Sequence, residues 1–514
     1  ASSDARPPAP AGAASQVTAR TQANESRLAR RSPARSITTS FAILCAVGTA
    51  LLMLPAMTTA RGSASLGTAL FTAVSASCVT GLSVVDTATY WTGLGKVTIL
   101  VLIQVGGFGI QALGTLWILL LNRRLGTTSR LAAQAETGVL TPGDVRRVLG
   151  LLAIITVTVE SAIAVLLGIR LWVRYDMSWP QAAWEGVFHS VSAFNNAGFA
   201  LASDSLSTYG DDPLILVPIS IAVVIGGLGF LVVREIFGRT TGERSLRPHR
   251  AGPSMTADEV LARGRELARR SRYRLGGFHP ERFGWANPVP LSLHTRLMLT
   301  GTAVLMVLGT LGFLVFEWAN PGTLAAMPWW EKLNQAVFSG GITPRTAGFN
   351  TLDYAAVAPE TRLLTDALMF VGAGSGSTGG GIKVTTLMVL AVAVRAEING
   401  HRDVNVTDRR IAGSTVRVAI AVTMISAAAV GLGTMVMLRV TDLSLDHAMF
   451  EVTSALATVG LSANVTPGLP ESGQLLLVVL MFLGRVGPLT LASSLTLRST
   501  FRAYRLPEGR PMIG

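Results

Sequence analysis

Four glycines, each closing a short apolar stretch, are the residues of this sequence best suited to bind a cation: Gly81, Gly198, Gly348 and Gly460. A dehydrated alkali cation needs a cage of oxygen atoms, and backbone carbonyls supply one when they turn toward a common axis. That turning requires backbone angles that glycine adopts more easily than other residues. The four glycines therefore predict rings of carbonyl ligands contributed by four separate stretches of the chain.

The residues around the four glycines match in several columns. Phe stands ten residues before each glycine, and a bulky apolar residue comes directly after each glycine. Six residues before the glycine, three stretches have Ser followed by Ala, whereas the third has Ile342-Thr343. The matching residues are Phe71, Phe188, Phe338 and Phe450; Ser75, Ser192 and Ser454; and Leu82, Phe199, Phe349 and Leu461. Glycines that only allowed close helix packing would need no shared Phe, so the columns predict an internal quadruplication.

We name four stretches the glycine segments: residues 79–82, 196–199, 346–349 and 458–461. They are predicted to form a selectivity filter in which the negative end of each preceding short helix points at the ion. The carbonyl ligands are expected from Val79, Thr80, Gly81, Asn196, Ala197, Gly198, Thr346, Ala347, Gly348, Thr458, Val459 and Gly460.

Acidic residues follow three of the glycine segments. They are Asp86, Asp204 and Asp353, and the fourth segment has no counterpart. In an outer vestibule these acids would concentrate cations electrostatically. The alternative is that they are ordinary loop acids.

A polar loop interrupts the apolar sequence at residues 372–383, which read GAGSGSTGGGIK. Glycine disfavours helix, and unwound backbone at membrane depth is tolerated only where it is buried in protein or lines a polar cavity. We name this stretch the Gly-rich loop and predict that it gates the path below the filter. The predicted gate residues are Gly372, Ala373, Gly374, Ser375, Gly376, Ser377, Thr378, Gly379, Gly380, Gly381, Lys383 and Arg485.

Arg485 and Lys383 belong to this gate because of their charge. Arg485 lies inside the last apolar stretch, where a charge is costly and usually functional, and it would oppose permeation or donate to loop carbonyls. Lys383 could act likewise, or its side chain could extend to the membrane surface. A phosphate-binding loop would need Ser or Thr after the lysine, but Val384 follows Lys383. The chain is therefore not expected to be an enzyme.

The composition indicates a protein that crosses a membrane several times. Of its 514 residues, 49% are hydrophobic and only 14% are charged, and the mean hydropathy is +0.47. The net charge of +13 is explained by Lys and Arg in cytoplasmic loops, so no nucleic-acid partner is expected. Cys45 and Cys78 lie in apolar surroundings and do not indicate a disulfide framework.

The apolar stretches predict an all-α membrane protein with eight transmembrane helices and four re-entrant pore loops. Each copy has two spans around one short segment, an M1–P–M2 repeat, and four copies would surround one pore with pseudo-fourfold symmetry. The predicted spans are residues 37–57, 94–121, 148–173, 214–236, 291–318, 361–394, 416–440 and 475–497. The predicted short segments are residues 66–78, 188–199, 338–349 and 450–461.

These stretches divide the chain into repeats and connecting segments. They are a disordered basic cytoplasmic tail (1–36), pore repeats (37–122, 145–236, 291–395 with a broken second helix, and 410–500), a basic cytoplasmic linker (237–290) and a cytoplasmic C-terminal tail (501–514). The distribution of Arg places both termini in the cytoplasm of a plasma-membrane protein, with Arg170 and Arg174 as exceptions. Residues 256–271 could form an amphipathic helix on the lipid surface or a solvated linker.

Several motifs resemble the Trk/Ktr/HKT superfamily of potassium transporters, and most of all its bacterial Ktr membrane subunits. They are FHSVSAFNNAGF at 188–199, TPRTAGFN at 343–350, ATVGLS at 457–462, the Gly-rich loop and GRVGP at 484–488. The resemblance extends over residues 37–500. It implies one chain that surrounds a pore for K⁺, with the family's filter glycines at the four positions given above and no covalent cofactor.

The resemblance also implies an assembly. It consists of a homodimer in membrane lipid and a cytosolic ring of nucleotide-binding regulatory (RCK-type) subunits that gates the flux. A plant sodium-selective branch has Ser in the first filter, so Gly81 favours potassium. Trk-type members carry two additional N-terminal spans, and none is evident before Ile37, which favours the Ktr type. Whether Na⁺ accompanies K⁺ stays open, as does the docking of the partner beside the long 239–282 loop.

A second class of function is a secondary carrier with alternating access, because carriers also use repeats and broken helices. A carrier needs one midplane site, whereas the four glycine segments are equivalent, so gated channel-like uptake is preferred. Glu160 lies within a predicted span and is expected to have a structural role, paired with a basic residue or the end of a pore helix. His189 is expected to form a hydrogen bond within its own helix.

Overall fold

The fold is built almost entirely of helices. A computed structural model describes residues 33–60, 62–123, 142–240, 291–406 and 409–497. Among these residues the only strands are β1 (Asn405–Val406) and β2 (Arg409–Arg410), which pair antiparallel. The predicted helical class is confirmed apart from this hairpin. Most of the tail at 1–36, most of the linker at 237–290 with its 256–271 stretch, and the tail at 501–514 lie outside the described residues.

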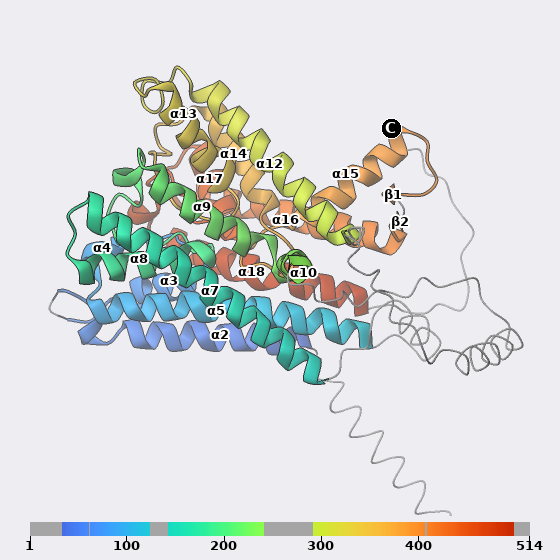
Figure 1. The fold of residues 1–514 in the computed structure, drawn as a ribbon, viewed down its shortest axis with the longest axis horizontal. Helices are drawn as coiled ribbons and strands as arrows, with labels where there is room; N and C mark the ends of the chain where they lie inside the picture. The colour runs from blue at the N-terminus through green and yellow to red at the C-terminus, as the bar shows by residue number, and fades with distance from the viewer. Residues whose placement is uncertain (1–32, 61, 124–141, 241–290, 407–408, 498–514) are drawn as a thin grey trace, which may run out of the picture.

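Long and short helices alternate along the chain (Figure 1). The first part contains α2 (Pro33–Leu52), α3 (Leu66–Ser77) and α5 (Gly93–Arg123), and the second contains α7 (Pro142–Arg174), α8 (Trp179–Phe194), α9 (Pro213–Leu228) and α10 (Phe230–Thr240). The third contains α12 (Leu293–Glu317), α13 (Trp329–Gln335), the π-helical turn η3 (Ala336–Ile342), α14 (Pro359–Val371) and α15 (Val384–Ile398). The fourth contains α16 (Gly413–Val440), α17 (Leu445–Ala457) and α18 (Glu471–Leu497). Short turns between them are η1 (Pro55–Met57), α4 (Thr87–Tyr90), η2 (Ser207–Tyr209) and η4 (Thr466–Gly468).

Local sequence fixes several helix starts. The side chains of Ser65, Asp212 and Ser292 accept hydrogen bonds from first-turn backbone N–H groups of α3, α9 and α12. Such N-caps satisfy N–H groups that the helix itself leaves without a partner. Proline begins α9 and α14, where its missing N–H is no loss.

Each short helix packs against its own part of the chain and against the part before it. α3 contacts α2 and α5 and also α18, whereas α8 contacts α7 and α9 and also α5. η3 contacts α12 and also α9, and α17 contacts α16 and α18 and also α14. The contacts therefore run from each part to the next and return from the fourth part to the first.

Several of the described helices could cross a membrane. Leu149–Arg174, Leu293–Glu317 and Gly413–Val440 are long and apolar enough, and the bent pair Pro213–Leu228 and Phe230–Phe237 would be a fourth span. Large apolar side chains on these helices face outward: Val315 is 73% exposed and Met435 is 69% exposed. In water such surfaces would be unfavourable, but in lipid they are expected. The predicted total of eight spans stays a prediction.

One predicted span is wrong in its shape. Residues 214–236 were expected to be continuous, but the chain bends by 105° between α9 and α10. Gly229, at the bend, has a φ of 86°, which favours glycine. A Cβ at this position would lie 2.7 Å from the carbonyl oxygen of Ser375 in the Gly-rich loop. The approach of the loop therefore accounts for the bend, and the isolated apolar stretch could not reveal it.

The second helix of the third part is broken where the sequence predicted. α14 ends at Val371 and α15 begins at Val384, so the unwound Gly-rich loop is confirmed. The backbone is left-handed in φ at Gly372, Gly376 and Gly381, whose φ angles are 64°, 72° and 67°. The polar stretch thus lies inside the helical body between two half-helices.

Candidate selectivity filter and gate

Three of the short helices end directly at a glycine segment. Their C-caps are Cys78 for α3, Asn195 for α8 and Thr458 for α17. In the third part, η3 ends at Ile342, shortly before its glycine segment. The last carbonyls of a helix carry partial negative charge. These helix ends therefore favour a cation near the glycine segments.

The backbone of the glycine segments is left-handed at every second residue. Positive φ angles occur at the glycine and two residues before it: Val79 57°, Gly81 100°, Asn196 60°, Gly198 70°, Thr346 67°, Gly348 70°, Thr458 50° and Gly460 94°. β-branched residues strongly disfavour this region, so the surrounding structure must enforce the conformation. Left-handed residues at alternate positions turn successive carbonyls toward one side, as a row of carbonyl ligands requires.

The four glycine segments form a ring in which each contacts the next and the fourth contacts the first. A Cβ added to Gly81 would lie 3.2 Å from the Cα of Gly198, and one added to Gly198 would lie 2.8 Å from the Cα of Gly348. A Cβ on Gly348 would lie 3.2 Å from the Cα of Gly460, and one on Gly460 would lie 3.1 Å from the Cα of Gly81. Four stretches far apart in the sequence therefore meet at one place, where no side chain fits between them.

The matched serines form hydrogen bonds with the backbone of the glycine segments. Ser75 Oγ donates to the carbonyl of Leu82 (2.6 Å) and accepts from the N–H of Gly81 (3.1 Å). Ser192 Oγ donates to the carbonyl of Phe199 (2.8 Å). Ser454 Oγ accepts from the N–H of Gly460 (3.1 Å). The recurrence of serine six residues before the glycine thus has a physical reason, because each serine hydroxyl binds the backbone of its own segment.

The third segment is supported differently, because Ile342 has no hydroxyl. Here η3 widens the end of the short helix, a feature common at functional sites. Thr343 Oγ1 donates to the carbonyl of Ser339 (3.1 Å) and lies 3.2 Å from the hydroxyl of Tyr354. Ser339 Oγ in turn lies 2.9 Å from Thr351 Oγ1, just beyond the segment.

The Gly-rich loop presses against the third and fourth glycine segments. A Cβ on Gly379 would lie 3.1 Å from the Cβ of Thr346, and one on Gly380 would lie 3.1 Å from the Cβ of Thr458. The loop is also attached to α9, because the N–H of Gly374 donates to the carbonyl of Gly227 (2.8 Å). The loop therefore lies against one side of the place where the segments meet.

Two basic side chains point into the Gly-rich loop. Arg485 is 4% exposed, and its Nη1 donates to the carbonyl of Thr378 while its Nη2 donates to the carbonyl of Gly106 (3.4 Å). Lys383 Nζ donates to the carbonyls of Gly379 (2.7 Å) and Gly380 (3.3 Å). Lys383 thus turns back onto the loop instead of extending to a surface. Both cations therefore bind carbonyls of the loop where it lies against the glycine segments.

Asp86 joins two loops that follow the first and second glycine segments. Its carboxylate accepts from Ser203 Oγ (2.6 Å), the N–H of Ala88 (2.9 Å) and Thr89 Oγ1 (2.8 Å). Burial alone would raise the pKa of Asp86, but the hydrogen bonds from Ser203, Ala88 and Thr89 outweigh it and leave this pKa below its usual value. The carboxylate is therefore held in its charged form.

The other two acids that follow glycine segments are exposed. Asp353 Oδ1 accepts from Asn464 Nδ2 (2.7 Å), which links the loops after the third and fourth segments. Asp204 accepts from the N–H of Thr208 (3.0 Å) and from its hydroxyl (2.6 Å). These acids hold loops in place and leave charge at the surface, so both sequence interpretations keep support.

Glu451 is a site residue that the sequence analysis left without a role. It is fully buried, directly after Phe450 on α17. Its carboxylate accepts from Ser462 Oγ (2.5 Å), the N–H of Ala463 (3.1 Å) and Thr466 Oγ1 (2.6 Å). It thereby fixes the chain that leaves the fourth glycine segment. In the sequence, the feature that could have pointed to Glu451 is its position directly after Phe450, one of the four matched Phe residues.

Glu160 has amide partners, and no cation pairs with it among the residues that the structure describes. Its carboxylate accepts from Gln104 Nε2 (3.3 Å) on α5 and from Asn195 Nδ2 (3.1 Å) at the end of α8. Asn195 also donates to Gln104 Oε1 (2.7 Å). Of the two partners expected for Glu160, the pore-helix end is therefore the one present. His189 Nδ1 lies 2.9 Å from the carbonyl of Glu185 within α8, as expected.

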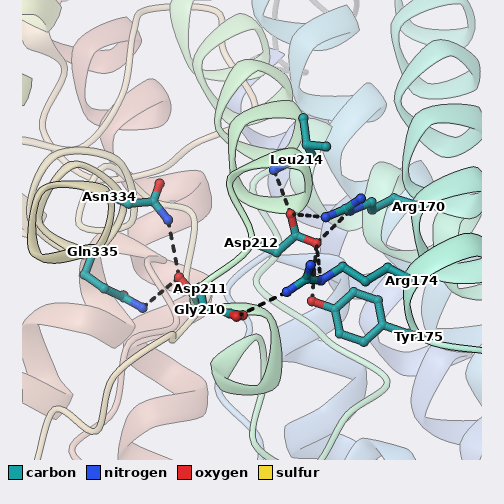
Figure 2. Close-up of polar contacts among 9 residues, drawn as sticks. All are labelled: Arg170, Arg174, Tyr175, Gly210, Asp211, Asp212, Leu214, Asn334 and Gln335. Carbon is teal, nitrogen blue, oxygen red and sulfur yellow. Dashed lines mark hydrogen bonds and ion pairs between the residues drawn. The ribbon is translucent and has the colours of Figure 1, made fainter. Parts of the chain in front are cut away.

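An ion-pair cluster joins the end of α7 to the start of α9 (Figure 2). Asp212 is 2% exposed and accepts from Arg170 Nε (2.8 Å) and Nη2 (3.2 Å) and from the hydroxyl of Tyr175 (3.3 Å). Arg174 Nε lies 3.6 Å from the same carboxylate, and Arg174 Nη2 lies 3.5 Å from Asp211. Arg170 and Arg174, the exceptions to the predicted cytoplasmic distribution of Arg, are thus paired with acidic residues.

Comparison with known proteins identifies relatives over nearly the whole chain. The profile of the TrkH family, described as "Cation transport protein", matches residues 13–250 and 291–501. Ktr system potassium uptake protein B from Bacillus subtilis (strain 168) is 34% identical over 94% of this chain and 97% of its own length. Potassium/sodium uptake protein NtpJ from Enterococcus hirae is 30% identical over 94% of this chain and 98% of its own length. The crystal structure of the potassium transporter TrkH from Vibrio parahaemolyticus superposes with a TM-score of 0.60 at 20% identity, covering 90% of this chain and 84% of that one.

Proposed function

This chain belongs to the TrkH family of cation transport proteins, and from that premise we propose that it takes up potassium through a selectivity filter formed by the four glycine segments. The family is one of transporters, not of enzymes. The observation that carries the proposal is the closed order of the four segments, each left-handed at its glycine and two residues earlier. Their carbonyls would replace the hydration shell of K⁺.

The proposed architecture is four M1–P–M2 repeats with pseudo-fourfold symmetry about the pore. Its support is the pattern of helix contacts, in which every short helix reaches the part before it and the fourth part returns to the first. Eight spans and four re-entrant segments follow from this arrangement. The twelve ligand residues named from the sequence lie in the segments that meet, with outer acids at the mouth formed by Asp86, Asp204 and Asp353.

The Gly-rich loop is proposed to gate this pore. Glycines at positions 379 and 380 let it lie directly against two of the segments. Arg485 and Lys383 hold its carbonyls and add positive charge to the path. Because a cation in this path would be repelled, the loop in its present position represents a closed state. Opening requires that the loop leave the segments.

The remaining parts of the proposal concern assembly and coupling. A homodimer in the plasma membrane, cytoplasmic termini and a cytosolic ring of nucleotide-binding subunits rest on the resemblance of the motifs. Dependence on Na⁺ is included because one relative is named a potassium/sodium uptake protein. The Gly-rich loop is the element on which a regulatory subunit would act.

A secondary carrier with alternating access is the competing function. It is favoured by the broken helix, since transporters use half-helices at their substrate sites. A carrier would bind its ion at one site between moving halves. The continuous contact among four equivalent segments favours a fixed filter instead.

The test is uptake by a bacterial strain that requires added potassium for growth. The chain should restore growth at low potassium and should carry Rb⁺, with and without Na⁺ and with and without a cytosolic partner. Absence of growth and of Rb⁺ uptake under every one of these conditions, with the protein present in the membrane, would refute the proposed function.

A further inference from the structure

Thr378 in the Gly-rich loop is held by two distant elements. Its carbonyl accepts from Arg485 on α18, as described above. Its hydroxyl donates to Asn196 Oδ1 (3.0 Å), and a longer contact (3.4 Å) reaches the carbonyl of Phe194. Both Thr378 and Asn196 are fully buried. One residue of the loop therefore joins the proposed gate to the proposed filter.

The amide of Asn196 extends this connection into the third glycine segment. Its Nδ2 donates to Thr346 Oγ1 (3.3 Å) and to the carbonyl of Arg345 (3.4 Å). Because a carbonyl can only accept, reversing the amide would set two oxygens against each other. The orientation of the amide is thus fixed, and its oxygen must face the hydroxyl of Thr378.

Among the side chains that the structure describes, Thr378 provides the loop's one hydrogen bond to a glycine-segment side chain. Ser377 Oγ donates to Gly374 within the loop, and Ser375 Oγ lies 2.9 Å from Thr385 Oγ1. Gly379 and Gly380 contact Thr346 and Thr458 without a directional bond. A movement of the loop would therefore act on the glycine segments through Asn196.

We propose that Thr378 and Asn196 couple the position of the gate to the ion selectivity of the filter. This inference rests on the proposed function. With the loop in place, the amide of Asn196 is bound on both sides and holds the second and third segments at their observed separation. When the loop leaves, Asn196 Oδ1 loses its partner, and the two segments gain freedom. The affinity of the filter for K⁺ then differs between the two gate positions.

The coupling must act in both directions. If the loop changes the affinity for K⁺, bound K⁺ must change the stability of the closed loop by the same factor. A filter that prefers K⁺ in the closed state thereby resists opening when K⁺ occupies it. Asn196 and Thr378 are positioning residues in this scheme, because they act through the backbone carbonyls that would bind the ion.

Thr378→Val tests the coupling in proteoliposomes that contain the full chain. The measured quantities are the Rb⁺ concentration at half-maximal uptake and the concentration of Na⁺ that halves Rb⁺ uptake. Valine keeps the shape and removes the hydroxyl, so the half-maximal concentration should rise, and the selectivity for Rb⁺ over Na⁺ should fall, by about twofold to tenfold, the range of one hydrogen bond. Thr378→Ser keeps the hydroxyl and should behave as the unmodified protein.

Thr365→Val is the matched control. Thr365 is buried on α14, and among the described residues its hydroxyl donates to one group, the carbonyl of Thr361 in the same helix (2.8 Å). A general effect of losing a buried hydroxyl would appear in both valine variants, whereas the coupling predicts a change of selectivity only at position 378. Asn196→Leu removes this bond together with the two Nδ2 bonds to Thr346 and Arg345, and it serves if Thr378→Val does not fold.

The outcomes separate the inference from the proposed function. If the unmodified protein carries no Rb⁺, the proposed function fails. If it carries Rb⁺ and either folded variant keeps both measured values, the coupling is overturned while the function stands. Equal selectivity changes in Thr365→Val and Thr378→Val would also overturn it. A selectivity change confined to Thr378→Val and Asn196→Leu, and reversed in Thr378→Ser, supports it.

Discussion

Replacing Gly81 with Ser should weaken the preference for K⁺ over Na⁺. Gly81 has a φ of 100°, a backbone conformation that costs a residue with a side chain about 1–3 kcal/mol. A Cβ at this position would also meet the carbonyl of Ala197 and would lie 3.2 Å from the Cα of Gly198 in the next segment. The first segment must therefore move away from the second, and its carbonyls leave the positions that fit K⁺. A displacement that weakens K⁺ binding relative to Na⁺ binding by about 1–3 kcal/mol lowers the selectivity by about 5-fold to 150-fold.

The assay is the reversal potential of the reconstituted protein between K⁺ and Na⁺ solutions. Gly62→Ser is the control, because Gly62 has a φ of 124° but a Cβ there would have no neighbour within 4 Å. Both variants carry similar backbone strain, and only Gly81→Ser disturbs the contact between segments. An unchanged potential in well-folded Gly81→Ser, or an equal change in both variants, would refute the assignment of the filter.

Three further predictions concern the gate and its support. Deleting residues 373–380 should raise basal Rb⁺ uptake, because the deletion removes the loop from the segments; equal or lower uptake by folded protein would contradict the gate. Arg485→Ala should raise basal uptake by roughly tenfold or more, since hydrogen bonds from a charged donor contribute about 1.5–3 kcal/mol each, whereas Arg485→Lys should raise it less. Uptake at the level of the unmodified protein in Arg485→Ala would exclude this role. Glu451→Ala should lower the thermal unfolding midpoint in detergent, because it leaves the two buried donors of Ala463 and Thr466 without this acceptor at a cost of about 1–3 kcal/mol each; an unchanged midpoint would count against its structural role.

The glycine pattern allowed the central features to be predicted because backbone constraints are local. A residue with φ near 60–100° in a crowded place favours glycine wherever the chain goes next. The Gly-rich loop and the four glycines that meet in the structure could therefore be located without knowledge of the packing. The serine column was also visible, although its purpose appeared only when Ser75 was seen to bind both Gly81 and Leu82.

The partners of buried charges could not be predicted, because packing decides them. Glu160 meets Gln104 and Asn195 across helices of different parts of the chain. The sequence shows only that a charge within a span needs a partner. The bend at Gly229 has the same origin, since the loop that causes it is more than a hundred residues away.

The third glycine segment shows how a repeat can hide a local difference. Its Ile342-Thr343 sequence departs from the Ser-Ala of the other segments, and the structure places the π-helical turn η3 there. The segment instead receives hydrogen bonds from Asn196 of its neighbour. The segment whose preceding residues depart from the pattern is thus bonded to a side chain of the neighbouring segment.

The most direct test of the central claim is anomalous diffraction from crystals of this protein soaked in Rb⁺ or Tl⁺. A fixed filter predicts density on the axis between Gly81, Gly198, Gly348 and Gly460, coordinated by carbonyls of all four segments. Density at a single site elsewhere between the helices, with none among the four glycines, would contradict the filter and favour the carrier.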